Sequence, residues 1–371
     1  MLSAALQEVP LAPATGCPSS REDTTFEYPA EAARAYAEGL ARPRGFDALG
    51  ACERLTRAAE LSPDHALVHE ALAEALSQLG YDALARESAT RALALSGSLG
   101  REKRLVIEGL ASETAKNWPR AVEIHRALFT FVPDNLDYGL KLASAQLEGE
   151  LYQDALATVA ALRHLAAPAG DDPRIDLVEA KAQGQLSNAQ GELAAATRAV
   201  TTGTSRGARF AVAEGLYQQG AAYDLMGRSD ESFAAMTKAA RRFHEMGDRT
   251  NEARALNRLA IGHAEAGDLA GAHRSFEAAQ AAFKAVGNLR GVAAIAGNLG
   301  VLLRNERDLK GARRQNELGI KLSMELREQS GTAISLHNLA FVLGQMGELQ
   351  DRPLMVILRP AGGGLPASWT P

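Results

Sequence analysis

Residues 203–207, GTSRG, carry a residue pattern that could do chemistry. They match the Gly-x-Ser-x-Gly pattern, in which the serine is a nucleophile held on a sharp turn between a strand and a helix of a parallel sheet. Here an alanine-rich stretch with helical character precedes Ser205, and no strand pattern is apparent in the chain. We therefore expect Ser205 to lie at a joint between helices or to cap a helix, and we expect no enzyme activity from this motif.

Two histidines form the other candidate site. His65 and His69 stand four residues apart, a spacing that places two metal ligands on one face of a helix. The zincin pattern needs Glu directly after the first His, where Ala66 stands, although Glu70 follows the second. No third ligand follows, so the sequence predicts ordinary helix histidines and no metal. The glycine-rich end, AGGGLPASWTP, lacks the Lys and helix of a phosphate loop, and we expect no cofactor.

Composition favours helices and weakens several other function classes. Hydrophobic residues make up 46% of the 371 residues but aromatic residues only 5%, so the apolar content is mostly Ala, Leu and Val. Ala and Leu favour helices, whereas aromatic and β-branched residues favour strands. The net charge of −5 gives no general attraction to nucleic acid or anionic lipid. The apolar runs are also far shorter than the roughly 20 residues that cross a bilayer.

The cysteines and the N-terminus bear on location. Cys17 and Cys52 are too few for a disulfide framework, so both are expected as free thiols in a reducing, cytoplasmic compartment. The segment ATGC, ending at Cys17, faintly resembles a lipoprotein cleavage site. However, no basic residue precedes the apolar part, and Pro10 and Pro13 interrupt it. We expect residues 1–27 to be a disordered leader.

The chain repeats itself at an interval of 40 residues. The segments ALNRLAIGHAEAGDL (255–269), IAGNLGVLLRNERDL (295–309) and SLHNLAFVLGQMGEL (335–349) share one skeleton. Small residues occupy fixed columns, which indicates a packing constraint. These columns are Gly220, Ala260, Gly300 and Ala340; Ser232, Ala272 and Ala312; Ala239, Ala279 and Gly319; and, at the mid-unit turn, Gly227, Gly267, Arg307 and Gly347.

The spacing within one unit predicts a helical hairpin. Apolar residues recur at intervals of three and four, as in an amphipathic helix, and Gly267-Asp268 breaks the unit in the middle. Leu269 is expected to begin the second helix. Ala260 and Ala272 would let the two helix axes approach closely. One such hairpin cannot bury its apolar face alone, so successive hairpins must stack.

These columns resemble the tetratricopeptide repeat (TPR). Residues 69–93, HEALAEALSQLGYDALARESATRAL, fit the pattern well, with Leu72-Ala73, Gly80, Ala85 and Ala92 in register. The resemblance covers roughly residues 30–349 and implies an all-α fold. That fold is an α-solenoid, or superhelix, of about eight antiparallel helix pairs. Pro63-Asp64 and Pro133-Asp134 are expected helix starts with Asp as the cap.

The predicted pairs divide the chain into two arrays. Residues 28–205 form an irregular N-terminal array, and residues 206–349 form a C-terminal array of 40-residue repeats. Residues 350–371 form an atypical, flexible tail, in which Arg352 and Pro353 stand where the next helix should run. The helix pairs are expected near 30–61, 64–95, 101–131, 134–165, 173–203, 206–246, 249–287 and 289–326, with a last helix at 328–346.

Parts of the first array resemble a narrower group. AARAYAEGLARPRGFDALGA, DNLDYGLKLASAQ and DDPRIDLVEA are similar to TPR regions of bacterial receptor-type serine/threonine kinases and of some transcriptional activators. This implies a signalling context. The chain has no kinase phosphate loop, His-Arg-Asp or Asp-Phe-Gly, so phosphoryl transfer by that mechanism is excluded. Two readings remain open. The chain is a non-enzymatic scaffold, or it is the sensor fragment of a kinase or activator whose effector domain is absent, in which case an extracytoplasmic place is the alternative.

The TPR resemblance also implies where binding occurs. In that family the groove-facing positions lie on the first helix of each pair, and the first helices line the concave face. An Asn can donate to and accept from one peptide group, and neighbouring Arg favours an acidic peptide or carboxylate. We therefore expect a protein or peptide partner, with the oligomeric state left open. The implied residues are Tyr217, Asp224, Arg254, Asn257, Arg258, Glu265, Asn298, Arg304, Asn305, His337, Asn338 and Gln345.

Overall fold

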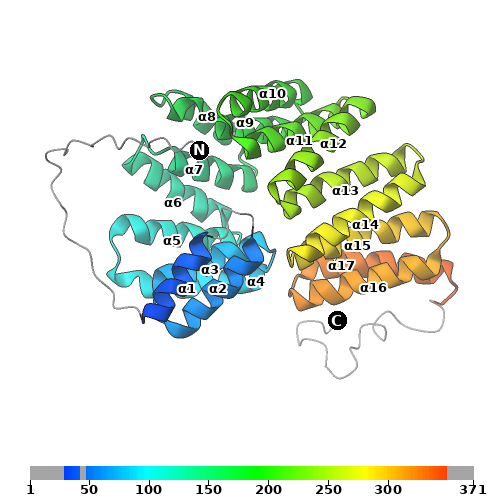
Figure 1. The fold of residues 1–371 in the computed structure, drawn as a ribbon, viewed down its shortest axis with the longest axis horizontal. Coiled ribbons are helices and arrows are strands. Elements are labelled where there is room, and N and C mark those ends of the chain that lie inside the picture. The colour runs from blue at the N-terminus through cyan, green and yellow to red at the C-terminus, as the bar shows by residue number, and fades with distance from the viewer. Residues whose placement is uncertain (1–28, 42–46, 349–371) are drawn as a thin grey trace, which may run out of the picture.

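The protein is an array of consecutive antiparallel helices (Figure 1). A computed structural model describes residues 29–41 and 47–348, and within these ranges there is no strand. The predicted α-solenoid of about eight helix pairs with one final helix is confirmed. Its helices are α1 (Ala30–Ala41), α2 (Ala48–Leu61), α3 (Ala66–Gln78), α4 (Asp82–Leu95), α5 (Arg101–Thr114), α6 (Trp118–Phe131), α7 (Leu136–Glu148), α8 (Tyr152–Arg163), α9 (Pro173–Gln185), α10 (Ala189–Ser205), α11 (Arg209–Leu225), α12 (Ser229–Met246), α13 (Arg249–Glu265), α14 (Leu269–Ala285), α15 (Leu289–Asn305), α16 (Leu309–Glu325) and α17 (Gln329–Gln345).

Helix length separates the early part of the array from the later part. The helices α1–α9 have 12 to 14 residues. From α10 onwards the helices have 17 or 18 residues. Each of these later helices begins 20 residues after the one before it, from Ala189 to Gln329. The 40-residue interval in the sequence is therefore two such helices with their turns.

Small residues lie where the two helices of a pair touch. Ala260 of α13 and Ala272 of α14 are both fully buried, as the columns predict. At Gly220 of α11, an added Cβ would lie 2.8 Å from Cε of Met236 on α12, so no side chain fits there. The axes approach closely because these positions carry little or no side chain.

The turns within and between pairs use a left-handed residue. Gly267 has φ 79°, and Gly227 and Gly247 adopt φ 70° and φ 78°. In the same column as Gly267, Arg307 adopts φ 70°, a conformation that costs a residue with a Cβ about 1–2 kcal/mol. The repeat therefore keeps the turn geometry even where it loses the glycine.

Asp or Asn before the helix supplies most of the caps. Asp268 and Asp308 each accept from the backbone N–H three residues later, at 2.9 Å. The prediction that Asp64 and Asp134 cap their helices is wrong. A turn closed by His65 N–H to Ser62 O comes first, so α3 begins at Ala66 and Asp64 instead pairs with Arg91 at 2.7 Å. At α7 the cap is Asn135.

The superhelix curves until its early and late parts meet (Figure 1). The hydroxyl of Tyr81, before α4, donates to the carbonyl of Gly287, before α15, at 3.2 Å. Arg290 of α15 pairs with Asp82 of α4, and its Nε lies 3.5 Å from Glu328. The repeat pattern alone does not predict this contact, which we call the α4–α15 contact.

No helix in the described part of the chain is both long and apolar enough to span a membrane. The predicted leader (1–27), Cys17, the tail (350–371) and the Arg352-Pro353 break all lie outside the described residues. Over α17, Ile334 and Phe341 remain exposed, at 62% and 52%.

Candidate functional site

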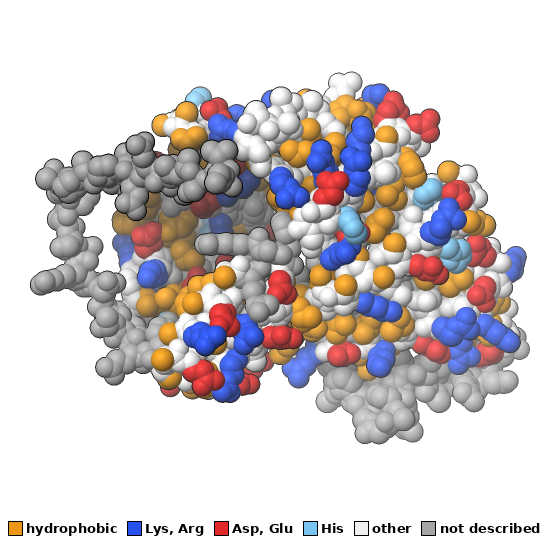
Figure 2. All heavy atoms as spheres, viewed as in Figure 1, with side chains coloured by type: hydrophobic (Ala, Val, Ile, Leu, Met, Phe, Trp, Pro, Cys, Tyr) orange, Lys and Arg blue, Asp and Glu red, His pale blue; other side chains and the backbone are white. Residues whose placement is uncertain are grey.

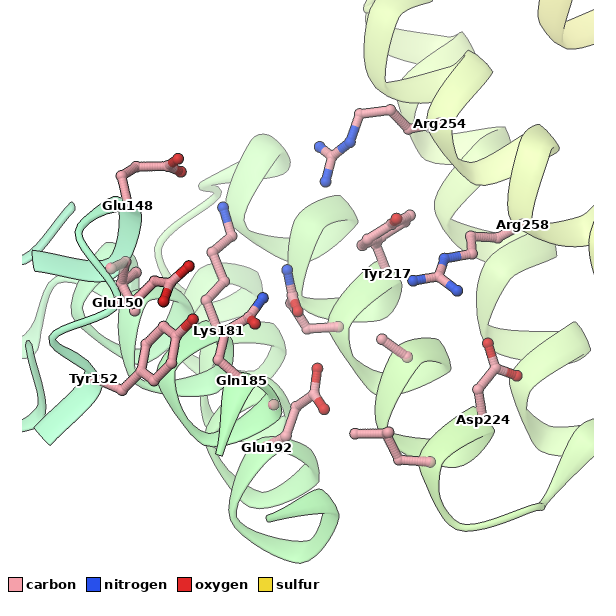
Figure 3. Close-up of a pocket in the computed structure, with 15 residues that line it drawn as sticks. Glu148, Glu150, Tyr152, Lys181, Gln185, Glu192, Tyr217, Asp224, Arg254 and Arg258 are labelled. Carbon is pink, nitrogen blue, oxygen red and sulfur yellow. The ribbon is translucent and has the colours of Figure 1, made fainter. Parts of the chain in front are cut away.

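A hollow of about 740 Å³ lies along the first helices of three successive pairs, α9, α11 and α13 (Figure 3). The turn between α7 and α8 closes one side with Glu148, Glu150 and Tyr152. A second hollow, of about 530 Å³, is lined mainly by α3, α5 and α7 and reaches Arg290. First helices thus line both hollows, as the TPR resemblance implies. We call the larger one the α9–α13 groove.

A buried glutamate, Glu214, contacts three of the residues that line this groove. Glu214 of α11 is only 1% exposed. Its carboxylate lies 3.2 Å from Lys181 of α9 and 3.5 Å from Arg254 of α13, and it accepts a bond of 3.2 Å from Gln218. Burial alone would raise the pKa of Glu214, but the two cations hold that pKa below its ordinary value. Glu214 therefore links three pairs and uses the charge of two groove cations.

Tyr217 is the aromatic surface in the middle of the groove. The guanidinium carbon of Arg254 lies 4.7 Å from its ring centroid, within cation–π range. Arg258, one turn further along α13, also lines the groove and extends toward Tyr217 (Figure 3). Within the described residues no carboxylate forms an ion pair with Arg258, although Asp224 of α11 acts on it electrostatically. Arg258 is therefore the groove cation available to an incoming anion.

Glu192 of α10 also lines the groove, and its carboxyl group lies beside Gly184 of α9 (Figure 3). It is 3% exposed, and its Oε2 has no hydrogen-bond partner among the described residues. Burial raises the pKa of this carboxyl to about 7; Arg258 opposes the shift and Asp224 adds to it. Burying a carboxyl group without a hydrogen-bond partner costs free energy of folding, so Glu192 is an unusual residue at this position.

The structure brings together only part of the predicted set. Tyr217, Arg254 and Arg258, with Asp224, line the α9–α13 groove. The other predicted residues lie elsewhere. Nδ2 of Asn298 donates to Oδ1 of Asn257 at 2.9 Å, linking α15 to α13.

Further along the array, the remaining predicted residues gather around Phe341 or stay apart. Arg304 lies 5.7 Å from the ring centroid of Phe341, and the His337 ring lies 5.0 Å from it. Asn305 is exposed at the end of α15, and Asn338 is half-buried on α17. Glu265 ends α13 and lines a smaller hollow beside the α11–α12 turn, and Gln345 ends α17.

The two motifs first considered for chemistry have structural roles. Ser205 is the last residue of α10, and its hydroxyl donates to the Thr202 carbonyl at 2.9 Å. The helix α10 leads directly into it, and the described residues before it contain no strand, so the strand–turn–helix of a nucleophile elbow is not formed at Ser205. His65 stands at the start of α3, and the Nε2 N–H of His69 donates to the Pro63 carbonyl at 2.8 Å. Among residues 29–41 and 47–348, no three His, Cys, Asp or Glu side chains gather closely enough to hold a metal.

Sequence reasoning missed Glu192, Glu214, Gln218 and Lys181. Gln218 stands 40 residues before Arg258 and so belongs to the same column as Arg258, Asn298 and Asn338. Glu192 follows Ala180 by 12 residues, and the same interval separates Ala260 from Ala272. Extending the repeat columns into the first array would have shown a carboxylate at a small-residue position.

The chain matches no protein-family model and no curated protein sequence. Among solved structures, a Rap protein complexed with Competence and Sporulation Factor superposes with a TM-score of 0.51 at 12% identity, over 86% of this chain and 99% of that one. A STAND signal-transduction ATPase with a tetratricopeptide repeat sensor, from Pyrococcus horikoshii, superposes with a TM-score of 0.52 at 14% identity. That match covers 78% of this chain and 47% of the ATPase. The chain has a TPR fold. The TPR solenoid places the groove residues on first helices, where the repeat geometry makes an elongated hollow.

Proposed function

We propose that the chain is a non-enzymatic scaffold that binds an extended peptide of a signalling partner in the α9–α13 groove. The observation that carries the proposal is the groove itself. It runs across three successive first helices and combines the Tyr217 ring with charged side chains of both signs. Stacked repeats form extended concave surfaces of the kind that suit an extended ligand.

The chemistry of the groove favours a peptide over a folded nucleic acid or a small apolar molecule. Figure 2 shows Lys and Arg side chains interspersed with Asp and Glu over the viewed face, without one large basic patch. In the groove, Lys181 and Arg254 are engaged by Glu214, and Arg258 is left for an acidic side chain or a terminal carboxylate. A peptide carries both the charged groups and the backbone donors and acceptors that such a surface can bind.

A regulatory or sensor role within a larger signalling system is the alternative function. It draws support from the superposition on a STAND ATPase with a tetratricopeptide repeat sensor, a match that covers 47% of that protein. Under this reading the partner is an effector such as a kinase or a transcriptional activator on another chain. Mass spectrometry of proteins that co-purify with the chain would separate the two, since an effector domain is recovered only in the second case.

The direct test uses synthetic peptides. The immobilised chain is exposed to a randomised nonapeptide mixture, and the affinity of one recovered peptide is then measured by calorimetry. Tyr217→Ala and Arg258→Ala should each weaken binding about tenfold or more, because Tyr217 is the aromatic ring in the middle of the groove and Arg258 is the groove cation not paired with Glu214. Arg274→Ala, at an exposed position of α14 outside the groove, is the control and should leave the affinity unchanged. Equal affinity in all variants would place binding elsewhere.

The half-buried side-chain amides of Asn298 and Asn338 give a second set of variants. If the peptide continues along the array, Asn298→Ala with Asn338→Ala should also weaken binding. Asn298 already links to Asn257, so its variant also removes an internal bond. A thermal melt of that double variant separates loss of fold from loss of ligand. Unchanged affinity would confine the ligand to the α9–α13 groove.

A further inference from the structure

One position of the repeat is occupied by small residues in every helix pair except the fifth. It is the fourth residue of each second helix, where that helix packs against the first. Each of these residues is 4% exposed or less. In chain order they are Ala51, Ala85, Ala121, Ala155, Glu192, Ser232, Ala272 and Ala312. Glu192 is the single ionisable side chain in this column.

The fold makes room for Glu192 rather than excluding it. A Cβ added to Gly184 of α9 would lie 2.8 Å from Cδ and from Oε2 of Glu192. The glycine therefore leaves the space that the carboxylate fills. Yet the space supplies no donor, because Oε2 has no hydrogen-bond partner in the described structure. A purely structural residue here would be Ala, as in most other pairs, and would avoid the cost of a buried unsatisfied polar group.

Three charged side chains, one on each of α9, α11 and α13, lie near Glu192. Asp224 on α11 repels it, and Arg258 on α13 attracts it without forming an ion pair within the described residues. Lys181 on α9 is bound to Glu214 instead, at 3.2 Å. The carboxylate thus faces the groove with no cation in contact.

We infer that Glu192 is the anchor for a cationic group of the bound peptide, either a Lys or Arg side chain or the N-terminal ammonium. The inference rests on the proposed peptide-binding function and adds its charge requirement. An ammonium or guanidinium entering from the groove would supply the donor that Oε2 lacks, in a site where charge-assisted bonds are strong. Arg258 would then receive the anionic group of the same peptide, so the groove selects a peptide carrying both charges.

Binding of this kind couples to proton release. Burial raises the pKa of Glu192 to about 7, so near neutral pH a large fraction of the free protein carries a proton there. A cation binds the ionised form and must lower that pKa. Binding of cationic peptides should therefore tighten between pH 6 and pH 8, which a merely structural glutamate would not produce.

The test compares four nonapeptide mixtures with randomised uncharged flanks and one fixed Asp. The central residue is Arg or its uncharged isostere citrulline, and the N-terminus is free or acetylated. These arms separate a side-chain cation from a terminal ammonium. Wild-type protein should retain the mixture bearing the recognised cation about tenfold more than the acetylated citrulline mixture at pH 8. In Glu192→Ala and Glu192→Gln this ratio should fall close to one.

Ser232→Ala, at the same position of the next pair, is the matched control and should keep the ratio. Glu192→Ala introduces the alanine that most other pairs carry at this position, so we do not expect it to unfold the protein. If it does, Glu192→Gln still tests the charge, because glutamine keeps the shape of the side chain. Retention of peptides with a ratio that does not depend on Glu192 would overturn this inference and leave the proposed function standing. Retention of no mixture would overturn both. An NMR titration in which the pKa of Glu192 is the same with and without peptide would also overturn the inference.

Discussion

At the scale of single residues, Glu192 shows how one substitution changes the chemistry of a repeat. Six of the eight equivalent positions hold Ala and one holds Ser, all buried at the contact between paired helices. Replacing this small side chain by a carboxylate puts an ionisable group where water is largely excluded. Its effect should therefore be visible in stability as well as in binding.

The stability of the free protein should depend on pH through Glu192. An unfolded Glu titrates near pH 4.3, whereas the folded protein keeps this proton until about pH 7. Between these values the folded state binds more protons than the unfolded chain, so stability falls as pH rises, by at most about 4 kcal/mol in total. Glu192→Ala removes the penalty, so its advantage over wild type in urea unfolding should grow from pH 4.5 to pH 7.5. With Ser232→Ala as the reference, an advantage that is flat across this range would contradict the assignment.

Arg307 is a residue whose backbone conformation disagrees with its type. It adopts φ 70° in a turn where Gly267 and Gly347 stand in the neighbouring repeats. Arg307→Gly should stabilise the protein by about 0.5–1 kcal/mol, because the relief of left-handed strain exceeds the entropy that glycine costs. Chemical denaturation measures it. Arg307→Ala keeps the Cβ and should bring no gain; equal gains in both variants would trace the effect to the lost charge.

At the scale of helices, the sequence predicts most of what the structure shows. The intervals of three and four define the helices, and Gly267-Asp268 marks a turn and a cap that both exist. The caps at Asp64 and Asp134 were predicted wrongly, because a proline followed by Asp is equally compatible with a turn one residue before the helix. Local patterns locate helices well but do not distinguish the cap from its neighbour.

The close contact within a pair can be tested by overfilling it. Ala272 is fully buried against α13, so Ala272→Leu should destabilise the protein by roughly 1–3 kcal/mol. Ala278→Leu, on the exposed face of the same helix α14, is the control for helix propensity and should be nearly neutral. Thermal melts of both variants decide the matter. A neutral Ala272→Leu would mean that the repeat register is wrong.

At the scale of the whole molecule, the α4–α15 contact is the feature that sequence reasoning could not supply. The residues on its two sides are more than 200 positions apart in the sequence; Tyr81 and Gly287, for example, are separated by 206 positions. No column of the repeat joins them. Curvature accumulates from a small rotation at each pair, and that rotation depends on side-chain packing rather than on the repeat interval. The site was also predictable only in part. Tyr217, Arg254 and Arg258 follow from the expectation that groove-facing residues lie on the first helix of each pair. The buried Glu214 and Glu192 do not follow from it.

Charge reversal tests whether this contact holds the superhelix closed in solution. Arg290→Asp would face Asp82 and Glu328 with a like charge, so small-angle X-ray scattering should report a larger radius of gyration than for wild type. Asp82→Arg combined with Arg290→Asp restores an opposite pair and should return the radius toward the wild-type value. A radius that is the same in all three proteins would show that the contact does not set the curvature.

The most direct measurement of the central claim is hydrogen–deuterium exchange of the full chain with and without a peptide recovered from the randomised mixture. A peptide in the α9–α13 groove should add protection in α9, α11 and α13 and in the α7–α8 turn, with little change in α12, α14 and α16. Protection confined to those second helices, or to α17, would contradict a ligand in the α9–α13 groove.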